Sequence, residues 1–117
     1  MQPSNFEQYE NVFKALSNGQ RIKILYLLLC VDDKVTVSEF AYVFEDSTSN
    51  ASRQLKMLRD ARLLEKHREG KWTYYSAASA DDAFIQKIFG AISAIPRSFV
   101  DAEIARCEYL AANRVAE

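Results

Sequence analysis

The stretch from Thr36 to Ala61 reads TVSEFAYVFEDSTSNASRQLKMLRDA and carries the signals for two short helices that meet at a polar turn. Thr36 and Glu39 have the spacing of a capping box, in which a hydroxyl and a carboxylate satisfy backbone N–H groups, so a helix is expected from here to about Phe44. Ser47 is a suitable N-cap for the next helix, which is expected to end at Ala61. Two short helices across a tight polar turn are typical of a helix-turn-helix.

The second of these helices, Thr48–Ala61, has one apolar face and one polar face. Ala51, Leu55 and Leu58 recur at spacings of four and three, so they are expected to face the core. The polar side chains gather in the N-terminal half, which is the half of a recognition helix that reaches base edges in a DNA major groove. The outward-facing set is Thr48, Ser49, Ser52, Arg53 and Lys56.

A β-hairpin is expected directly after the two helices. Its strands are Leu64–Arg68 and Lys71–Ser76, and Gly70 supplies the positive φ that the turn requires. A shorter edge strand is expected at Val35–Val37. The cations and the imidazole expected to cluster at the hairpin tip are His67, Arg68 and Lys71.

Two further helices are expected before Thr36. The first has one apolar face, and the second, Gln20–Cys30, follows an Asn18 N-cap. Because the second helix is apolar around most of its circumference, it is expected to lie in the core. The apolar face of the first helix consists of Phe6, Tyr9, Val12, Phe13 and Leu16.

The last part of the chain also predicts helix. One helix starts at Ser79 or Ala80 and must kink or restart at Pro96, and another runs from about Ser98 to Arg114. The apolar stripe of the latter consists of Val100, Ile104, Cys107 and Ala111. Since a wide apolar stripe on the terminal helix of so small a domain needs a surface to cover it, we expect a homodimer formed through the first and last helices.

Size and composition fit one mainly α-helical domain with a small β-hairpin, spanning residues 1–117, with dimerisation helices in 78–117. The 117 residues are 49% hydrophobic and 26% charged, as in an ordinary globular domain. The formal net charge is −1, but residues 53–71 contain seven Lys and Arg against three Asp and Glu. This local positive region suffices for contact with phosphates, because exposed charges further away are largely screened.

The sequence predicts neither a membrane segment nor a secretion signal. The longest apolar stretch, Ile22–Val31, is interrupted by Lys23 and falls short of the roughly 18 residues that a membrane span needs. The first residues, Met1–Asn5, lack the basic start and apolar run of a leader, and two distant cysteines do not form a disulfide framework. The cytoplasm is therefore the expected location.

Four short segments follow one another through the middle of the chain. They are Phe13–Asn18 (FKALSN), Arg21–Leu25 (RIKIL), Ser52–Arg59 (SRQLKMLR) and Arg68–Ser76 (REGKWTYYS). In this order and at this spacing they resemble the ArsR family of bacterial transcriptional repressors, also called the ArsR/SmtB family. The resemblance implies a winged helix-turn-helix homodimer that binds an inverted repeat in double-stranded DNA and leaves it when an inducer binds, often a metal ion or metalloid.

The expected DNA contacts come from the recognition helix and from the hairpin, or wing. Short hydrogen-bonding side chains and the Arg53 guanidinium are suited to base edges, the guanidinium to guanine in particular. Lys56, Arg68 and Lys71 are better placed for phosphates, which fix the register without reading sequence. The full set of expected DNA-binding residues is Thr48, Ser49, Asn50, Ser52, Arg53, Lys56, His67, Arg68 and Lys71.

The chain departs from the family pattern at the C-terminal end of the recognition helix and at the positions where relatives bind their inducers. The family usually has glycine where this chain has Arg62, and an arginine in a left-handed cap costs up to roughly 1 kcal/mol. Metalloid sensors of the family open the third helix with two cysteines, and the corresponding residues here are Thr36 and Ser38. His67 is the one histidine of the chain, whereas zinc needs three or four ligands, so no metal or other cofactor is expected and the inducer is left open.

Cys30 and Cys107 leave one alternative open, a repressor that senses its signal through thiol chemistry. Some relatives sense oxidants or reactive sulfur with one cysteine on the second helix and one on the last, but their second-helix cysteine falls at Tyr26. Both cysteines lie on apolar stripes, which favours inert packing over a redox switch. A metalloid bridging the two thiols across a dimer is a weaker alternative.

The sequence therefore predicts a DNA-binding transcriptional regulator, which the resemblance makes a repressor. The alternatives are a repressor that senses oxidants or reactive sulfur through Cys30 and Cys107, and a winged-helix module that binds protein. An enzyme is not expected, because the sequence offers no nucleophile with a base, no paired carboxylates and no phosphate-binding loop.

Overall fold

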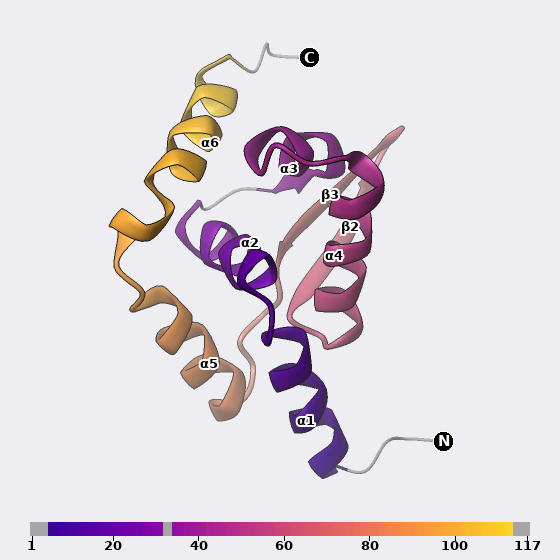
Figure 1. Cartoon of the computed structure of the whole chain (residues 1–117). Coiled ribbons are helices and arrows are strands. Elements are labelled where there is room, and N and C mark those ends of the chain that lie inside the picture. Colours follow the sequence, from indigo (N-terminus) through magenta and orange to yellow (C-terminus); the bar gives the residue numbers. More distant parts are fainter. Residues whose placement is uncertain (1–4, 32–33, 114–117) are drawn as a thin grey trace.

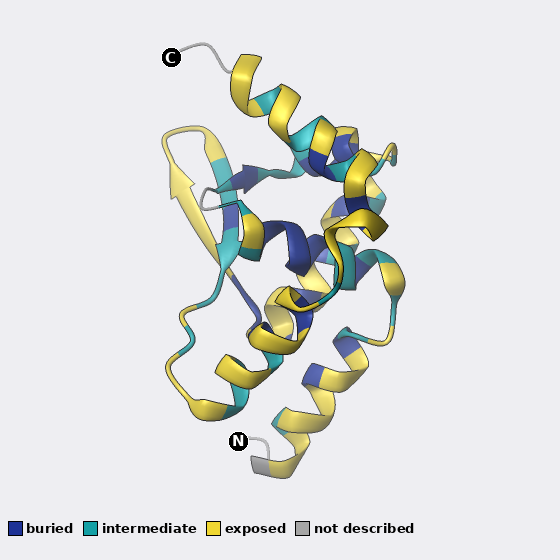
Figure 2. Ribbon diagram, turned by 90° about the vertical axis from the view of Figure 1, so that its left-hand side faces the viewer, coloured by how far each residue is buried: buried dark blue, intermediate teal, exposed yellow. Residues whose placement is uncertain are grey.

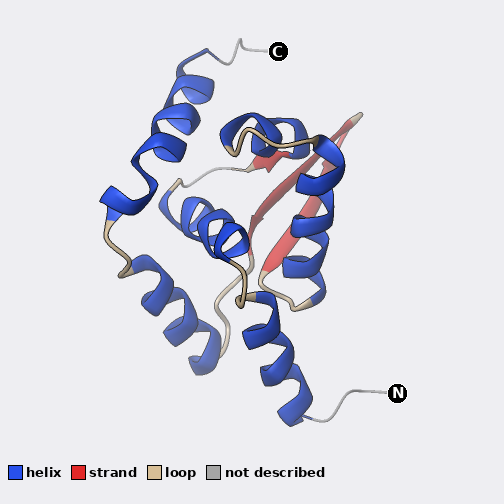
Figure 3. Ribbon diagram, in the orientation of Figure 1, coloured by secondary structure: helices blue, strands red, loops and turns tan. Residues whose placement is uncertain are grey.

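The computed structural model describes residues 5–31 and 34–113. Helices dominate, and a small three-stranded sheet lies at one side of them (Figures 1 and 3). The elements are α1 (Asn5–Ala15), α2 (Gly19–Cys30), β1 (Val35–Thr36), α3 (Val37–Val43), α4 (Thr48–Asp60), β2 (Leu64–Glu69), β3 (Trp72–Ala77), α5 (Ala83–Ser93), the 3₁₀ turn η1 (Arg97–Val100) and α6 (Asp101–Asn113). The mainly helical fold with a small hairpin is confirmed, and the predicted helix end at Arg114 lies outside the described residues.

The helix starts around the helix-turn-helix are capped as the sequence predicts. The Asn18 side chain accepts the hydrogen bond that starts α2, and the Ser47 hydroxyl accepts the one that starts α4, at 3.1 and 3.0 Å respectively. Thr36 and Glu39 form the reciprocal capping box of α3, with N···O distances of 3.2 and 2.9 Å. Each cap satisfies backbone N–H groups that the first helical turn leaves unpaired, so the boundaries of these helices are determined locally.

The core is built around α2, which lies between α4 and the sheet on one side and α5 and α6 on the other (Figure 1). In Figure 2 most of α2 is buried, whereas α1, α5, α6 and the hairpin tip present exposed residues to the outside. The largest fully buried side chains are Phe40, Ile24, Leu25, Leu27, Leu55, Leu58, Leu63 and Val43. Burial of one such side chain contributes on the order of 1.5 to 3 kcal/mol, so this cluster fixes α3 and α4 against α2.

The sheet has the strand order β1–β3–β2 and is antiparallel throughout. The hairpin is confirmed, with strand bounds one residue from those expected, and Gly70 has a φ of 62° in its turn. Val35 of β1 lies opposite Tyr75 of β3, and both side chains are buried. The short edge strand ends at Thr36 because that residue is also the N-cap of α3.

The C-terminal helices start later than expected. Asp82 accepts a hydrogen bond from the Ile85 backbone at 2.8 Å, so α5 starts at Ala83 and not at Ser79 or Ala80. The chain restarts after Pro96 as predicted, but as the η1 turn, and α6 follows from Asp101. The stronger local cap therefore determines where α5 begins.

The apolar stripe of the last helix is partly covered by its own chain. Val100 and Ile104 are buried, and Arg106 of α6 donates to the Val43 carbonyl of α3 at 2.5 Å. Ala111 is exposed. The part of the stripe at Val100 and Ile104 therefore does not require a second subunit to cover it, contrary to the reasoning from the sequence.

No helix within the described residues is long and apolar enough to cross a membrane.

Candidate nucleic-acid interface

Helix α4 presents its polar face to solvent, as the sequence predicts. Ala51, Leu55 and Leu58 are at most 1% exposed and hold the helix on the core. The five side chains expected to face outward are all exposed, and all lie in the first nine residues of the helix. These exposed residues are Thr48, Ser49, Ser52, Arg53 and Lys56.

The charged residues of α4 differ in their partners. Lys56 forms an ion pair with Asp60, one helical turn away, at 2.8 Å. Arg53 donates to the Asn50 side-chain oxygen at 3.3 Å, and within residues 5–31 and 34–113 no carboxylate lies at ion-pair distance from it. The Arg53 guanidinium therefore keeps its full charge and most of its donors for another molecule.

The wing consists of β2, β3 and their turn, and its tip is exposed. Arg68 lies opposite Thr73 near the end of the ladder, and Lys71 stands in the turn. The Lys71 ammonium lies 5.4 Å from the ring centroid of Trp72, a cation–π distance. Figure 1 shows the wing tip and the start of α4 at the same end of the molecule, so the two predicted contact elements face the same side.

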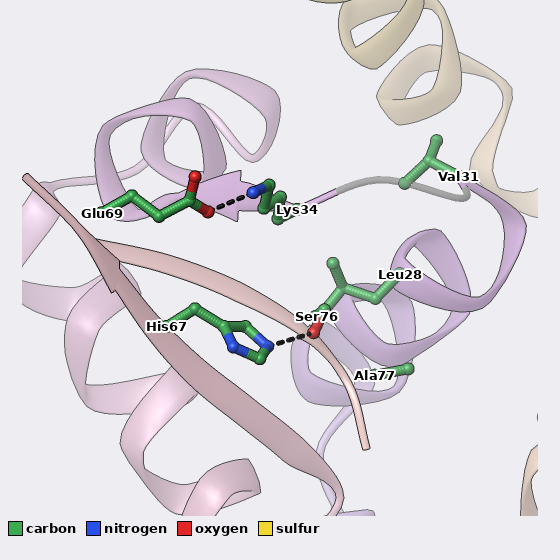
Figure 4. Close-up of a pocket in the computed structure, with 7 residues that line it drawn as sticks. All are labelled: Leu28, Val31, Lys34, His67, Glu69, Ser76 and Ala77. Carbon is green, nitrogen blue, oxygen red and sulfur yellow. Dashed lines mark hydrogen bonds and ion pairs between the residues drawn. The ribbon is translucent and has the colours of Figure 1, made fainter. Parts of the chain in front are cut away.

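His67 does not join Arg68, so the expected cluster at the wing tip was wrong for this pair of side chains. Successive residues of a strand point to opposite faces, which separates His67 from Arg68. His67 lies 3.1 Å from the Ser76 hydroxyl and 3.7 Å from a Glu65 oxygen. Its side chain borders a cavity of about 340 Å³ between the wing and the end of α2 (Figure 4).

The cavity beside His67 also contains an ion pair. Lys34 and Glu69 both line the cavity and form an ion pair, while Leu28, Val31 and Ala77 supply apolar walls (Figure 4). The Lys34 ammonium also lies 5.3 Å from the centroid of the Tyr74 ring. These contacts tie the wing to the segment that leads into β1.

Two polar residues that hold the interface were missed from the sequence. Arg21 is only 8% exposed and donates to the Ala15 carbonyl at 2.6 Å and to Gln54 of α4 at 2.8 Å. Asp46 accepts from the Gln20 side chain at 3.1 Å and also from Asn50. A signal for Arg21 was present, because it stands three and four residues before Ile24 and Leu25 on the buried face of α2.

Comparison with known proteins places these elements in a family. Residues 18–66 match the model described as "Bacterial regulatory protein, arsR family". The transcriptional repressor SdpR of Bacillus subtilis is 41% identical over 66 residues, which are 56% of this chain and 71% of that protein. The chain belongs to the ArsR family.

Other relatives are similar to part or all of this chain. The arsenical resistance operon repressor of Bacillus subtilis is 41% identical over 68 residues, which are 58% of this chain and 64% of that protein. The chain spans about three fifths of the length of the first curated relatives it matches. The homodimeric winged helix-turn-helix DNA-binding domain Mb0332 from Mycobacterium bovis has a TM-score of 0.65 at 26% identity, covering 100% of this chain and 98% of that one.

The residues at the metalloid-sensor positions of the ArsR family do not fit a soft metal. The Thr36 hydroxyl is engaged in the capping box of α3, and Ser38 is an exposed hydroxyl. Thiophilic metals and metalloids prefer thiolates. Across the part of the chain that the structure describes, no three His, Cys, Asp or Glu side chains are grouped as metal ligands would be.

Arg62, where the ArsR family usually has glycine, retains the left-handed conformation, with a φ of 65°. The backbone N–H of Leu63 returns to the Leu58 carbonyl at 3.0 Å, which closes the end of α4. The turn geometry is therefore kept in spite of the side chain, and the strain stays in the backbone of Arg62.

The two cysteines differ in exposure. Cys30 is the last residue of α2 and is exposed, so the expected buried packing role was wrong for it, whereas Cys107 on α6 is half-buried. The two are not joined by a disulfide in the described structure. Burial raises the pKa of the Tyr26 hydroxyl, and a hydrogen bond with the Cys30 side chain raises it further.

Proposed function

We propose that this chain is a transcriptional repressor that acts in the cytoplasm as a homodimer on an inverted repeat in double-stranded DNA. The observation that carries the proposal is the exposure of the polar half of α4 and of the wing cations at one end of the molecule. A helix of this kind fits a major groove, and cations beside it fit the flanking phosphates. Relatives named as repressors support the same function.

The proposed roles follow from side-chain chemistry. Arg53 contacts a guanine edge through its guanidinium, and short hydroxyl groups on the same face contact neighbouring bases or phosphates. Lys56, Arg68 and Lys71 neutralise phosphates and fix the register. The hydroxyl groups belong to Thr48, Ser49 and Ser52. His67 contacts DNA only at the edge of the surface that α4, Arg68 and Lys71 form, since its side chain points away from Arg68.

The homodimer is proposed to form through α1 and the C-terminal helices in 78–117, of which α5 lies beside α1 at the end opposite the wing tip (Figure 1). Phe84 of α5 contacts Tyr9 and Phe13 of α1, with ring centroids 4.7 and 5.8 Å apart. Phe6 and Phe13 are 73% and 58% exposed in the single chain. An exposed aromatic patch of this kind marks a protein interface, and the homodimeric relative from Mycobacterium bovis supports a second copy as its partner.

Selection of tight binders from a random DNA pool tests this function. The expected result is a pseudo-palindrome whose half-sites are about 10 base pairs apart, bound by two chains. Sedimentation of the complex measures that stoichiometry. Absence of any enriched DNA sequence at low salt would overturn the proposal and favour a winged-helix module that binds protein.

A thiol-sensing repressor is the second candidate, because Cys30 is exposed and contacts Tyr26. In this version, oxidation joins the Cys30 and Cys107 thiols in a disulfide, with an oxidant or persulfide accepting two electrons, and DNA affinity changes. Mobility shifts with and without oxidant test it. A response that persists in Cys107→Ser would remove the candidate.

A further inference from the structure

Asp46 collects three hydrogen bonds at the turn between α3 and α4. Its Oδ1 accepts from the Ser47 backbone at 2.7 Å, and its Oδ2 accepts from Gln20 at 3.1 Å and from the Asn50 amide nitrogen. These donors, first Gln20 and then Asn50, hold the pKa of Asp46 below its usual value. A carboxylate at neutral pH can only accept hydrogen bonds, so each group that bonds to it must present a donor.

That requirement fixes the orientation of the Asn50 amide. The NH₂ group of Asn50 faces Asp46, which leaves the amide oxygen to accept from Arg53 Nη1 at 3.3 Å. An asparagine that reads adenine must present its oxygen and its NH₂ group to the same base. Here the two ends are occupied by different neighbours, so Asn50 is engaged within the protein and half-buried.

The same contacts connect Arg53 to the core helix α2. The chain of hydrogen bonds runs from Gln20 through Asp46 and Asn50 to the Arg53 guanidinium. Arginine is flexible, and ordering such a side chain on binding costs conformational entropy. A guanidinium that is already oriented loses less freedom when it meets a guanine edge.

We propose that Asp46 and Asn50 are positioning residues that orient the Arg53 guanidinium for bidentate contact with guanine. The proposal rests on the DNA-binding function proposed above. Asn50 thereby changes from a base-contacting residue to a residue that acts through Arg53. Asp46 acts through Asn50, and its hydrogen bond with Gln20 connects these residues to α2.

The test measures discrimination between the selected DNA and the same DNA with the contacted guanine replaced. Asn50→Ala and Asp46→Asn are each expected to reduce this discrimination about fivefold in the wild-type background and to have no further effect in an Arg53→Ala background. Asp60→Asn is the matched control, because it also replaces one carboxylate by an amide, but at the C-terminal end of α4, where the carboxylate bonds Lys56. It is expected to raise affinity for both DNAs alike.

A measurement without DNA separates this proposal from the proposed function. The NMR signal of the Arg53 Nε–H group is expected to report an ordered guanidinium in the wild type and a mobile one in Asn50→Ala, with thermal melting as the check on folding. An Arg53 signal that is the same in Asn50→Ala as in the wild type would overturn the positioning role, as would equal loss of binding to both DNAs in Asn50→Ala and Asp46→Asn. If the wild type selects no DNA sequence, the proposed function fails while the Arg53 signal still decides the positioning role.

Discussion

The Arg21 guanidinium donates to the Gln54 side-chain oxygen across 2.8 Å and so joins the start of α2 to the middle of α4. Its Nε also donates to the Ala15 carbonyl at the end of α1, at 2.6 Å. A cation is favoured at a helix C-terminus, where unpaired carbonyls carry partial negative charge. One buried side chain therefore joins α1, α2 and α4, and no buried side-chain nitrogen or oxygen in the described structure lacks a hydrogen bond.

Replacing Arg21 is expected to destabilise the fold. Arg21→Met removes hydrogen bonds from a charged donor and leaves the Ala15 and Gln54 oxygens without it, which costs about 2 to 3 kcal/mol of unfolding free energy. Urea denaturation measures the loss. Lys23→Met is the control on the same helix, since Lys23 makes one part-buried ion pair with Glu103 where the buried Arg21 makes several hydrogen bonds, so its loss is expected to be smaller. Equal losses in the two variants would contradict the role given to Arg21.

Lys71 is expected to contribute to DNA affinity without selecting a sequence. Lys71→Ala should weaken binding to operator and random DNA alike and flatten the slope of affinity against salt by about one counterion. Arg53→Ala should instead cost about 1 to 3 kcal/mol on the operator and little on random DNA. Titrations over a range of salt concentrations measure both effects. Arg97→Ala, on the exposed η1 turn, should leave the slope unchanged, and a sequence-dependent effect of Lys71 would refute its phosphate role.

The parts of the fold that depend on short-range chemistry could be predicted from the sequence. The Thr36 capping box, the Ser47 cap and the Gly70 turn each involve residues within three positions of one another. The outward face of α4 also followed, because helical periodicity alone separates Leu55 from Arg53. Local geometry of this kind does not depend on how distant segments pack.

The remaining features depend on contacts between distant segments. Gln20 and Asp46 are 26 positions apart, and Arg21 and Gln54 are 33 apart, so no local pattern indicates either hydrogen bond. The separation of His67 from Arg68 is an exception, because it follows from the alternation of side chains along β2 and could have been predicted from the sequence. A one-residue change in position along a strand reverses the face that a side chain occupies.

The proposed dimer predicts the effect of a charge in the aromatic patch. Phe13→Asp should convert the dimer to a folded monomer, because Phe13 is exposed in the single chain and a buried unpaired carboxylate at an interface is costly. Sedimentation equilibrium measures the mass, and circular dichroism checks the helix content. Phe99→Asp is the control, since Phe99 is 71% exposed on η1, outside this patch. A dimer that survives Phe13→Asp would place the interface elsewhere.

Arg62→Gly is expected to stabilise the protein. The φ of 65° at Arg62 is unfavourable for a residue with a side chain, and glycine removes that strain at a gain of up to about 1 kcal/mol. Arg59→Gly is the matched control, because it places glycine within α4 and should cost about 1 kcal/mol. Urea unfolding of the two variants should therefore shift in opposite directions. A loss of stability in Arg62→Gly would show that its side chain contributes more than the strain costs.

The hydrogen bonds to Asp46 predict an acid-sensitive contribution to stability. Gln20, Asn50 and the Ser47 backbone hold the pKa of Asp46 lower in the folded state than in the unfolded chain, so the unfolded state binds more protons as the pH falls. The contribution is therefore complete above the ordinary carboxyl value of about 4 and is lost as the pH falls through the lower folded value. Thermal melting of the wild type and Asp46→Asn, compared from neutral to acidic pH, should show a difference that shrinks across this window. A difference of constant size would mean that the ionised carboxylate does not stabilise the turn, and that asparagine fails there for reasons of shape alone.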